Sequence, residues 1–196
     1  NLFFRGLGAT LGRKNLDFSF FLSYRALDAR IIEEGFTSLV ETGYHRTPLE
    51  KEKKNSLGSW TAGMNLSWHA ERWKAGVTAL GYGYDHKDAG SINYYNACKN
   101  RSVPFGGLSA DLTFRLPSWR FFSEVALDFG LSPAVLAGMI YYGQNGNQAG
   151  MLLRCFTPSY TAAYSARLGR NTSPSNEYSL QITGTLVLPR KWKMDM

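Results

Sequence analysis

SWTAGMNLSWH, residues 59–69, carries an apolar residue at every second position from Trp60 to Trp68, with polar residues or glycine between them. A period of two is typical of a half-buried β-strand, because successive side chains point to opposite faces. The stretches 15–26, 108–116 and 178–188 alternate in the same way. No stretch of comparable length carries the helical period of about 3.6 residues. The sequence therefore predicts an all-β fold.

Weaker patterns predict further strands at roughly 2–12, 73–84, 120–128, 134–142 and 148–156, with the start of a tenth at 192. Short turns are expected at 12–14, 70–72, 117–119, 143–147 and 189–191, and longer loops at 27–58, 85–103 and 157–177, with 129–133 as a short exception. Short turns at one end and long loops at the other are typical of an outer-membrane barrel, whereas a soluble sandwich has no reason to separate them. We therefore expect a transmembrane antiparallel up-and-down β-barrel, of which about ten strands are visible.

Both ends of the chain fall inside this pattern. Asn1 lies within strand-like alternation, and Lys193 lies at the start of another strand. We expect residues 1–196 to be part of one outer-membrane β-barrel domain, with further strands and an upstream periplasmic region outside this sequence. The lack of a signal peptide at Asn1 is therefore uninformative.

Composition narrows the classes of function. Charged residues make up 19% of the chain, below the roughly 25% of soluble domains, while aromatic residues make up 14%. The aromatic content excludes a disordered chain, and the sequence has no run of about 18 apolar residues that would form a transmembrane helix. The net charge is +7, but the basic residues form no continuous face with regularly spaced aromatic residues. We expect this segment to bind no nucleic acid.

The short turns carry a repeated aromatic and basic signature, as in residues 71–74 (ERWK) and 190–193 (RKWK). Tryptophan beside Arg or Lys is typical of a membrane interface that faces anionic lipid. Trp60 and Trp68 lie roughly 27 Å apart along a strand, which spans roughly 20 Å when tilted by about 40°. The predicted interfacial girdle is Trp60, Trp68, Trp73, Trp119 and Trp192, and the predicted lipid partners are lipopolysaccharide and phospholipid of the outer membrane. Alternatively, these residues are ordinary hairpin ends of a soluble sheet.

Charged residues on the polar side of the strands are predicted to face a lumen: Asp17, Arg25, Lys74, Asp111, Arg115, Glu124, Asp128 and Arg154. One interpretation is the charged constriction of a channel, since rings of charged side chains select ions. The other is a set of structural ion pairs that fills a closed lumen. The mixed signs, with no ring of a single sign, favour the second interpretation.

Candidate catalytic residues are few. His69 ends the polar side of its strand, and His45 lies in the longest loop, where outer-membrane hydrolases can carry Ser, His and Asp at the barrel rim. No nucleophile elbow or phosphate-binding loop accompanies them, so we expect no catalytic residue and no cofactor. Thr47-Pro48 followed by Glu50 instead predicts the start of a short helix.

The chain has two cysteines, Cys98 and Cys155, which both map to the long-loop end. We expect two thiols, with a disulfide in an oxidising location as the alternative. No cysteine or histidine pair has metal-ligand spacing, so no metal is expected.

Several stretches resemble one known family: Tyr24 to Arg30 (YRALDAR), Thr42 to Pro48 (TGYHRTP) with Glu50 and Lys53-Lys54, Phe121 to Ala126 (FFSEVA), Tyr160 to Gly169, and Asn176-Glu177. They look like the C-terminal outer-membrane β-barrel of helix-hairpin-helix domain-containing proteins of Bacteroidota. The resemblance is scattered over most of the chain, and no single motif is as specific as a metal-ligand signature. It implies a barrel in the outer membrane of a Gram-negative bacterium. Nothing here matches the family's periplasmic helix-hairpin-helix region, so a nucleic-acid or peptide-binding role is not carried over.

Three functions follow as expectations. The first is a non-enzymatic subunit or accessory component of a larger cell-envelope complex for export, uptake or outer-membrane assembly. Its basis is the apolar run around Phe129 to Leu153, where both sides of the strands are apolar and one side is free for other envelope proteins. The second is a stand-alone porin-like channel, based on the polar inner side. The third is a hydrolase at the rim that uses His45.

Overall fold

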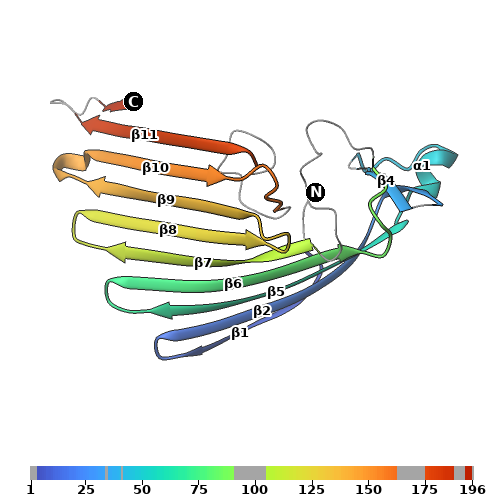
Figure 1. Cartoon of the computed structure of the whole chain (residues 1–196), viewed down its shortest axis with the longest axis horizontal. Helices are drawn as coiled ribbons and strands as arrows, with labels where there is room; N and C mark the ends of the chain where they lie inside the picture. The colour runs from blue at the N-terminus through green and yellow to red at the C-terminus, as the bar shows by residue number, and fades with distance from the viewer. Residues whose placement is uncertain are drawn as a thin grey trace.

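The computed structural model describes residues 4–33, 35–40, 42–90, 105–162, 175–187 and 193–195. In these ranges the chain is mostly β-structure, with one short α-helix and one 3₁₀ turn (Figure 1). The expected all-β fold is confirmed. No helix in the described part of the chain is long and apolar enough to cross a membrane. Trp192, Cys98 and residues 163–169 of the family resemblance lie outside the described residues.

Ten strands form one antiparallel up-and-down sheet, in the order β1-β2-β5-β6-β7-β8-β9-β10-β11-β12. Their bounds are β1 Gly6–Arg13, β2 Leu16–Leu27, β5 Leu57–His69, β6 Trp73–Tyr84, β7 Phe105–Arg115, β8 Trp119–Asp128, β9 Pro133–Tyr142, β10 Gln148–Phe156, β11 Glu177–Val187 and β12 Lys193–Asp195. Every predicted strand is present. The largest differences are at the starts of two strands: β1 begins at Gly6 and not at residue 2, and β7 begins at Phe105 and not at residue 108. In the described residues β1 and β12 do not pair with each other. Closure into a barrel therefore stays a prediction.

The connections separate by length, as expected. Short turns follow β1, β5, β7 and β9 at one end of the sheet, at the left of Figure 1, whereas the long connections that follow β2, β6 and β10 lie at the other end. The turn after β1 contains Lys14 at φ 51°, and the 3₁₀ turn Gln144–Gly146 contains Asn145 at φ 61°. These left-handed backbone conformations let the chain reverse within a few residues.

The two faces of the sheet are the reverse of those in a soluble protein. We name apolar face the side that carries Leu22 of β2 and Trp60 of β5, and polar face the side that carries Ser23 and Thr61. Leu22 is 61% exposed, while the adjacent Ser23 is 3% exposed. Trp60 is 36% exposed, while the adjacent Thr61 is 3% exposed. The exposed side of this sheet is therefore its apolar side.

Neighbouring strands are staggered along the sheet. A row of cross-strand partners begins at Thr10 and ends eight strand steps later at Glu177. Thr10 lies three residues before the end of β1, whereas Glu177 lies ten residues before the end of β11. This shift of about seven residues over eight steps corresponds to a strand tilt of roughly 30°, at about 3.4 Å per residue and 4.8 Å between strands. The tilt is close to the roughly 35–45° of closed barrels.

A small folded segment covers the long-loop end between β2 and β5. It contains a second antiparallel pair, β3 Ala29–Ile32 and β4 Gly35–Leu39, and the helix α1 Pro48–Glu52. The predicted helix start is confirmed, because Thr47 and Glu50 form a capping box with Pro48 in the first turn. The strand pair was not predicted within the loop 27–58. Its Phe36 is buried against Ala29 and Leu57.

Candidate functional site

The strand register places all eight predicted lumen residues on the polar face. A row of partners runs from Asp17 through Ser67 and Gly76 to Asp111 and Glu124, and row partners share a face. The full set on this face is Asp17, Arg25, Lys74, Asp111, Arg115, Glu124, Asp128 and Arg154. That this face lines a lumen remains a prediction, but the residues chosen for it lie together.

Within the described residues, Arg154 and Asp17 each contact an ionisable partner. Arg154 lies 3.4 Å from Glu177 across β10 and β11, and its Nε donates a 2.9 Å hydrogen bond to Ser179. Both members of this pair are largely buried, so removing either one would leave an uncompensated buried charge. Asp17 pairs with His69 at 3.1 Å near the short turns, where both side chains are exposed. These contacts agree with the interpretation of structural ion pairs.

Asp111 and Glu124 do not follow that interpretation. They are direct cross-strand partners on β7 and β8, and like charges at opposite positions are destabilising. Among the described residues neither carboxylate has a hydrogen-bond or ion-pair partner. The carboxylate of Asp111 lies directly over Gly76. A Cβ added at Gly76 would overlap with it. The polar face thus carries a local pair of negative charges.

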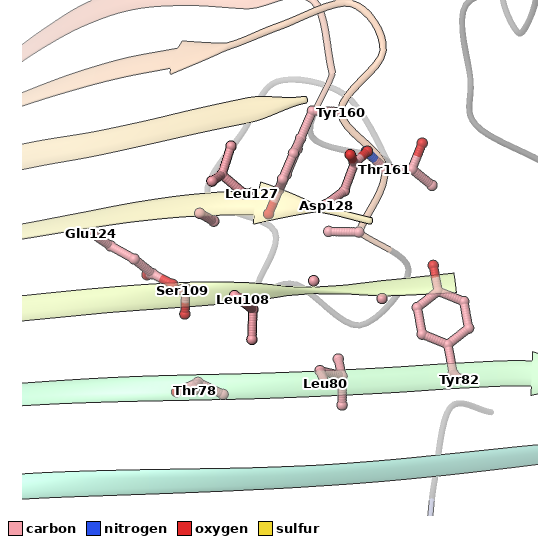
Figure 2. A pocket seen from close by; sticks show the side chains of 14 residues that line it. Thr78, Leu80, Tyr82, Leu108, Ser109, Glu124, Leu127, Asp128, Tyr160 and Thr161 are labelled. Atoms are coloured by element: carbon pink, nitrogen blue, oxygen red, sulfur yellow. The ribbon is translucent and has the colours of Figure 1, made fainter. Parts of the chain in front are cut away.

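A loop residue covers the polar face beside this pair. Tyr160 follows β10 and lies over β8, with Asp128 and Thr161 next to it (Figure 2). Asp128 is 4% exposed, and its carboxylate accepts hydrogen bonds from the backbone N–H groups of Ser132 at 2.8 Å and Thr161 at 3.0 Å. Burial raises the pKa of the Tyr160 phenol, and the negative charges of Glu124 and Asp128 raise it further. Asp128 therefore fixes the loop residue Thr161, which lines a half-open cavity on this face together with Tyr160.

Aromatic residues gather on the apolar face near the short turns. Trp73 stacks on Phe114 with ring centroids 4.2 Å apart, and Trp119 lies 4.8 Å from the ring of Tyr141. Trp68 lies on the same face of β5, one row away from Trp73. Trp60 lies on this face toward the opposite end, paired with Tyr24. Four of the five predicted girdle residues are described, and these four share the apolar face, as a girdle requires.

His45 has an acidic partner at the long-loop end. Its Nε2 lies 2.7 Å from Asp28 Oδ2, whereas the carboxylate of a Ser-His-Asp triad binds Nδ1 and leaves Nε2 for the nucleophile. In the part of the chain that the structure describes, no serine, threonine or cysteine side chain hydrogen-bonds to His45. Asp28 Oδ1 also accepts a 2.8 Å hydrogen bond from the backbone N–H of Asn55. The arrangement connects loop segments and holds no nucleophile in place.

The sequence analysis predicted no structural role for the side chains of Asp28 and Tyr160. Neither belongs to an alternating stretch, so periodicity gives no signal for them. Asp28 and Tyr160 both lie inside stretches of the family resemblance, which was the only available pointer. Cys155 is a half-buried free thiol on β10, and Cys98 lies outside the described residues.

Within the described residues no three His, Cys, Asp or Glu side chains gather to hold a metal ion. No protein-family model, curated protein or solved structure matches this chain.

Proposed function

We propose that this chain forms part of the wall of a transmembrane β-barrel in the outer membrane of a Gram-negative bacterium. It acts there as a non-enzymatic subunit or accessory component of a larger cell-envelope complex. The observation that carries the proposal is the reversal of the two faces, with Leu22 and Val77 exposed and Ser23 and Thr61 buried. Large apolar side chains on the outside are favourable only in contact with lipid or a partner.

Three further features support the membrane assignment. The stagger of the strands corresponds to a tilt of roughly 30°, which is close to the tilt of strands in closed barrels. The tryptophans of the apolar face lie near both ends of the sheet, where interfacial girdles are found. The resemblance to outer-membrane barrels of Bacteroidota implies the same location.

A pair of arginine substitutions tests the membrane assignment. Val77 and Thr78 are adjacent on β6, midway between the rows of Trp73 and Trp60, but Val77 lies on the apolar face and is 55% exposed. Arginine at a lipid-facing site near the bilayer midplane costs about 2–4 kcal/mol, so Val77→Arg should destabilise the protein by that amount in vesicles. Thr78→Arg should have a much smaller effect, because its side chain points to the polar face. Denaturant unfolding of the full-length protein from lipid vesicles measures both.

The result expected for a water-soluble sheet is the opposite. An arginine at an exposed site such as Val77 would be tolerated, while an arginine on the less exposed face at Thr78 would be disruptive. Equal tolerance of both variants, or a greater loss for Thr78→Arg, would refute the membrane assignment.

The assignment to a complex rests on β9, where both faces carry apolar side chains. Val135 and Met139 lie on the apolar face, and Leu136 and Ile140 lie on the polar face. One side of such a strand can contact lipid while the other contacts a plug or a partner protein. Purification of the tagged full-length protein in mild detergent should recover stoichiometric envelope proteins. A protein that purifies alone would contradict this part of the proposal.

A stand-alone channel is the second candidate, and the Asp111–Glu124 pair favours it. Two adjacent carboxylates in a lumen would select cations. Planar-bilayer recordings of the full-length protein should then show cation selectivity that decreases or reverses in Asp111→Lys. The absence of stepwise conductance would exclude the channel and leave the proposed subunit role unaffected.

A further inference from the structure

The cavity on the polar face is small and is lined by three neighbouring strands and one loop. It has a volume of about 220 Å³ and lies between β6, β7 and β8 and the loop that carries Tyr160 (Figure 2). This volume is below the roughly 300–1,000 Å³ of sites for drug-sized ligands. The cavity therefore suits a single small chemical group and not an extended molecule.

Glycine allows two strands to approach closely beside the cavity. An added Cβ at Gly107 would lie 2.3 Å from the carbonyl oxygen of Leu127 and 3.0 Å from the Cα of Asp128. Because these contacts are with backbone atoms, a side chain at this position cannot be accommodated by a rotamer change. The strands β7 and β8 therefore approach each other closely at this edge of the cavity.

The walls combine apolar side chains with aromatic, hydroxyl and acidic groups. Tyr160 and Tyr82 line the cavity from different elements, and Thr78 and Ser109 supply hydroxyl groups. Glu124 lines it from the rim with an exposed side chain, and in the described residues its carboxylate has no hydrogen-bond or ion-pair partner. The negative charge of Asp128 is nearby, but its oxygens accept hydrogen bonds from the backbone of Ser132 and Thr161. Glu124 is thus the acidic group with free capacity to bind a ligand.

These groups favour an organic cation over a metal ion. Metal sites need at least three suitable ligands gathered together, and no such group occurs among the described residues. An ammonium group needs one carboxylate, hydroxyl acceptors and aromatic faces, which attract cations through their quadrupole. Burial raises the pKa of Tyr160, the negative charges of Glu124 and Asp128 raise it further, and its phenol stays neutral.

We propose that this cavity binds the ammonium group of a small primary aliphatic amine, with Glu124 as the charge partner and Tyr160 as the aromatic cover. The site lies on one face of the sheet and does not depend on the barrel function proposed above. The same ammonium chemistry has two sources, a free amine or the side chain of a lysine in a polypeptide. The experiment below distinguishes the two.

The full-length protein in detergent micelles is titrated with n-butylamine, with Nα-acetyl-lysine amide, and with n-butanol as a neutral analogue of the same length. Binding is followed at pH 7 by the NMR amide shifts of Ser109, Glu124 and Thr161. We expect saturable shifts with at least one of the two amines and none with n-butanol. Saturable binding of n-butylamine would show that a free amine is enough to occupy the site. Saturable binding of the blocked lysine, without binding of n-butylamine, would point to a lysine side chain in a polypeptide. No saturable shift with either amine, or equal affinity for n-butanol, would overturn the proposal.

Two matched variants test the role of the carboxylate. Glu124→Gln keeps the size of the side chain and should weaken amine binding by up to about fivefold, the loss expected for an ion pair at an exposed carboxylate. Asp17→Asn removes a carboxylate on the same face but outside the cavity, and should leave the affinity within about twofold. An unchanged affinity in Glu124→Gln, or an equal loss in both variants, would overturn the assignment of Glu124. The comparison of amine with alcohol in the unmodified protein tests the site even where a variant fails to fold.

Discussion

At the scale of single residues, Asp28 connects three segments where β2 ends. Its carboxylate accepts hydrogen bonds from His45 Nε2 at 2.7 Å and from the backbone N–H of Asn55 at 2.8 Å. Burial by itself would raise the pKa of the Asp28 carboxyl, but these hydrogen bonds outweigh burial and the pKa is lowered. A carboxyl whose pKa is lower in the folded protein than in the unfolded chain stabilises the fold above the unfolded pKa. That stabilisation is lost as the pH falls through the folded pKa.

Acid should therefore release the contact between Asp28 and Asn55. We expect hydrogen-exchange protection of the Asn55 amide to be constant between pH 7 and 5 and to decline below about pH 4, the unfolded pKa of Asp. Amide exchange of the full-length protein, corrected for intrinsic rates, measures this. In Asp28→Asn the decline below pH 4 should disappear, while Asp85→Asn should retain it. A loss of protection already between pH 7 and 6 would contradict a role for the carboxyl.

At the scale of elements, Gly63 determines how β2 and β5 fit together on the polar face. An added Cβ at Gly63 would lie 2.4 Å from Cε1 of Phe21, which occupies the space above it. The ring of Phe21 also contacts Phe4, with centroids 5.2 Å apart, so its freedom to move is restricted. Gly63→Ala should therefore destabilise the protein by about 1–3 kcal/mol through overpacking.

Gly81 supplies the matched control for this prediction. It lies on β6 of the same sheet, but an added Cβ there meets nothing closer than 3.9 Å. Gly81→Ala should be neutral or slightly stabilising, since alanine reduces the entropy of the unfolded chain. Denaturant unfolding in vesicles measures both variants. The double variant Gly63→Ala with Phe21→Ala should show less loss than the sum of the two single changes, and strict additivity would argue against the steric cause.

The elements differ in how well the sequence alone predicts them. The long strands of the sheet follow from a period of two, which is local and visible in β5 and β2 without any structure. The helix at Pro48 follows from Thr47 and Glu50, since a capping box is also a local signal. The pair β3 and β4 is different, because Phe36 receives its hydrogen-bond partners from Lys87 and Ala89, far along the chain. Contacts of that kind leave no mark in a short window of sequence.

The same distinction holds for the site. Asp111 and Glu124 were predicted to share a face, Asp111 from the alternating stretch 108–116 and Glu124 from the weaker strand 120–128, and the register places them opposite each other. Their direct pairing depends on the register between β7 and β8, which alternation does not determine. The cover that Tyr160 provides depends on a loop conformation that Asp128 fixes from another strand. The face could therefore be predicted, whereas the cavity could not.

At the scale of the whole molecule, β1 is the decisive strand. It pairs with β2 on one side and is the edge of the described sheet on the other, with every residue exposed. In lipid an unpaired strand edge is not tolerated, because each free N–H or C=O costs several kcal/mol. Its Leu7 and Leu11 lie on the apolar face, so β1 belongs to the lipid-facing wall if the membrane assignment holds. The stagger of about one residue per strand continues naturally into a closed barrel, in which β1 pairs with a further strand.

Hydrogen exchange of the full-length protein in detergent tests this closure. In a closed barrel the N–H groups of Gly6–Arg13 that point away from β2 are bonded to a second neighbour and should exchange as slowly as those that point toward β2. In an open sheet they should exchange faster by orders of magnitude, in an alternating pattern along the strand. The central strand β7, which has neighbours on both sides, supplies the internal reference. Uniform protection along β1 at the level of β7 would support the barrel, and alternating protection would show that this edge remains open.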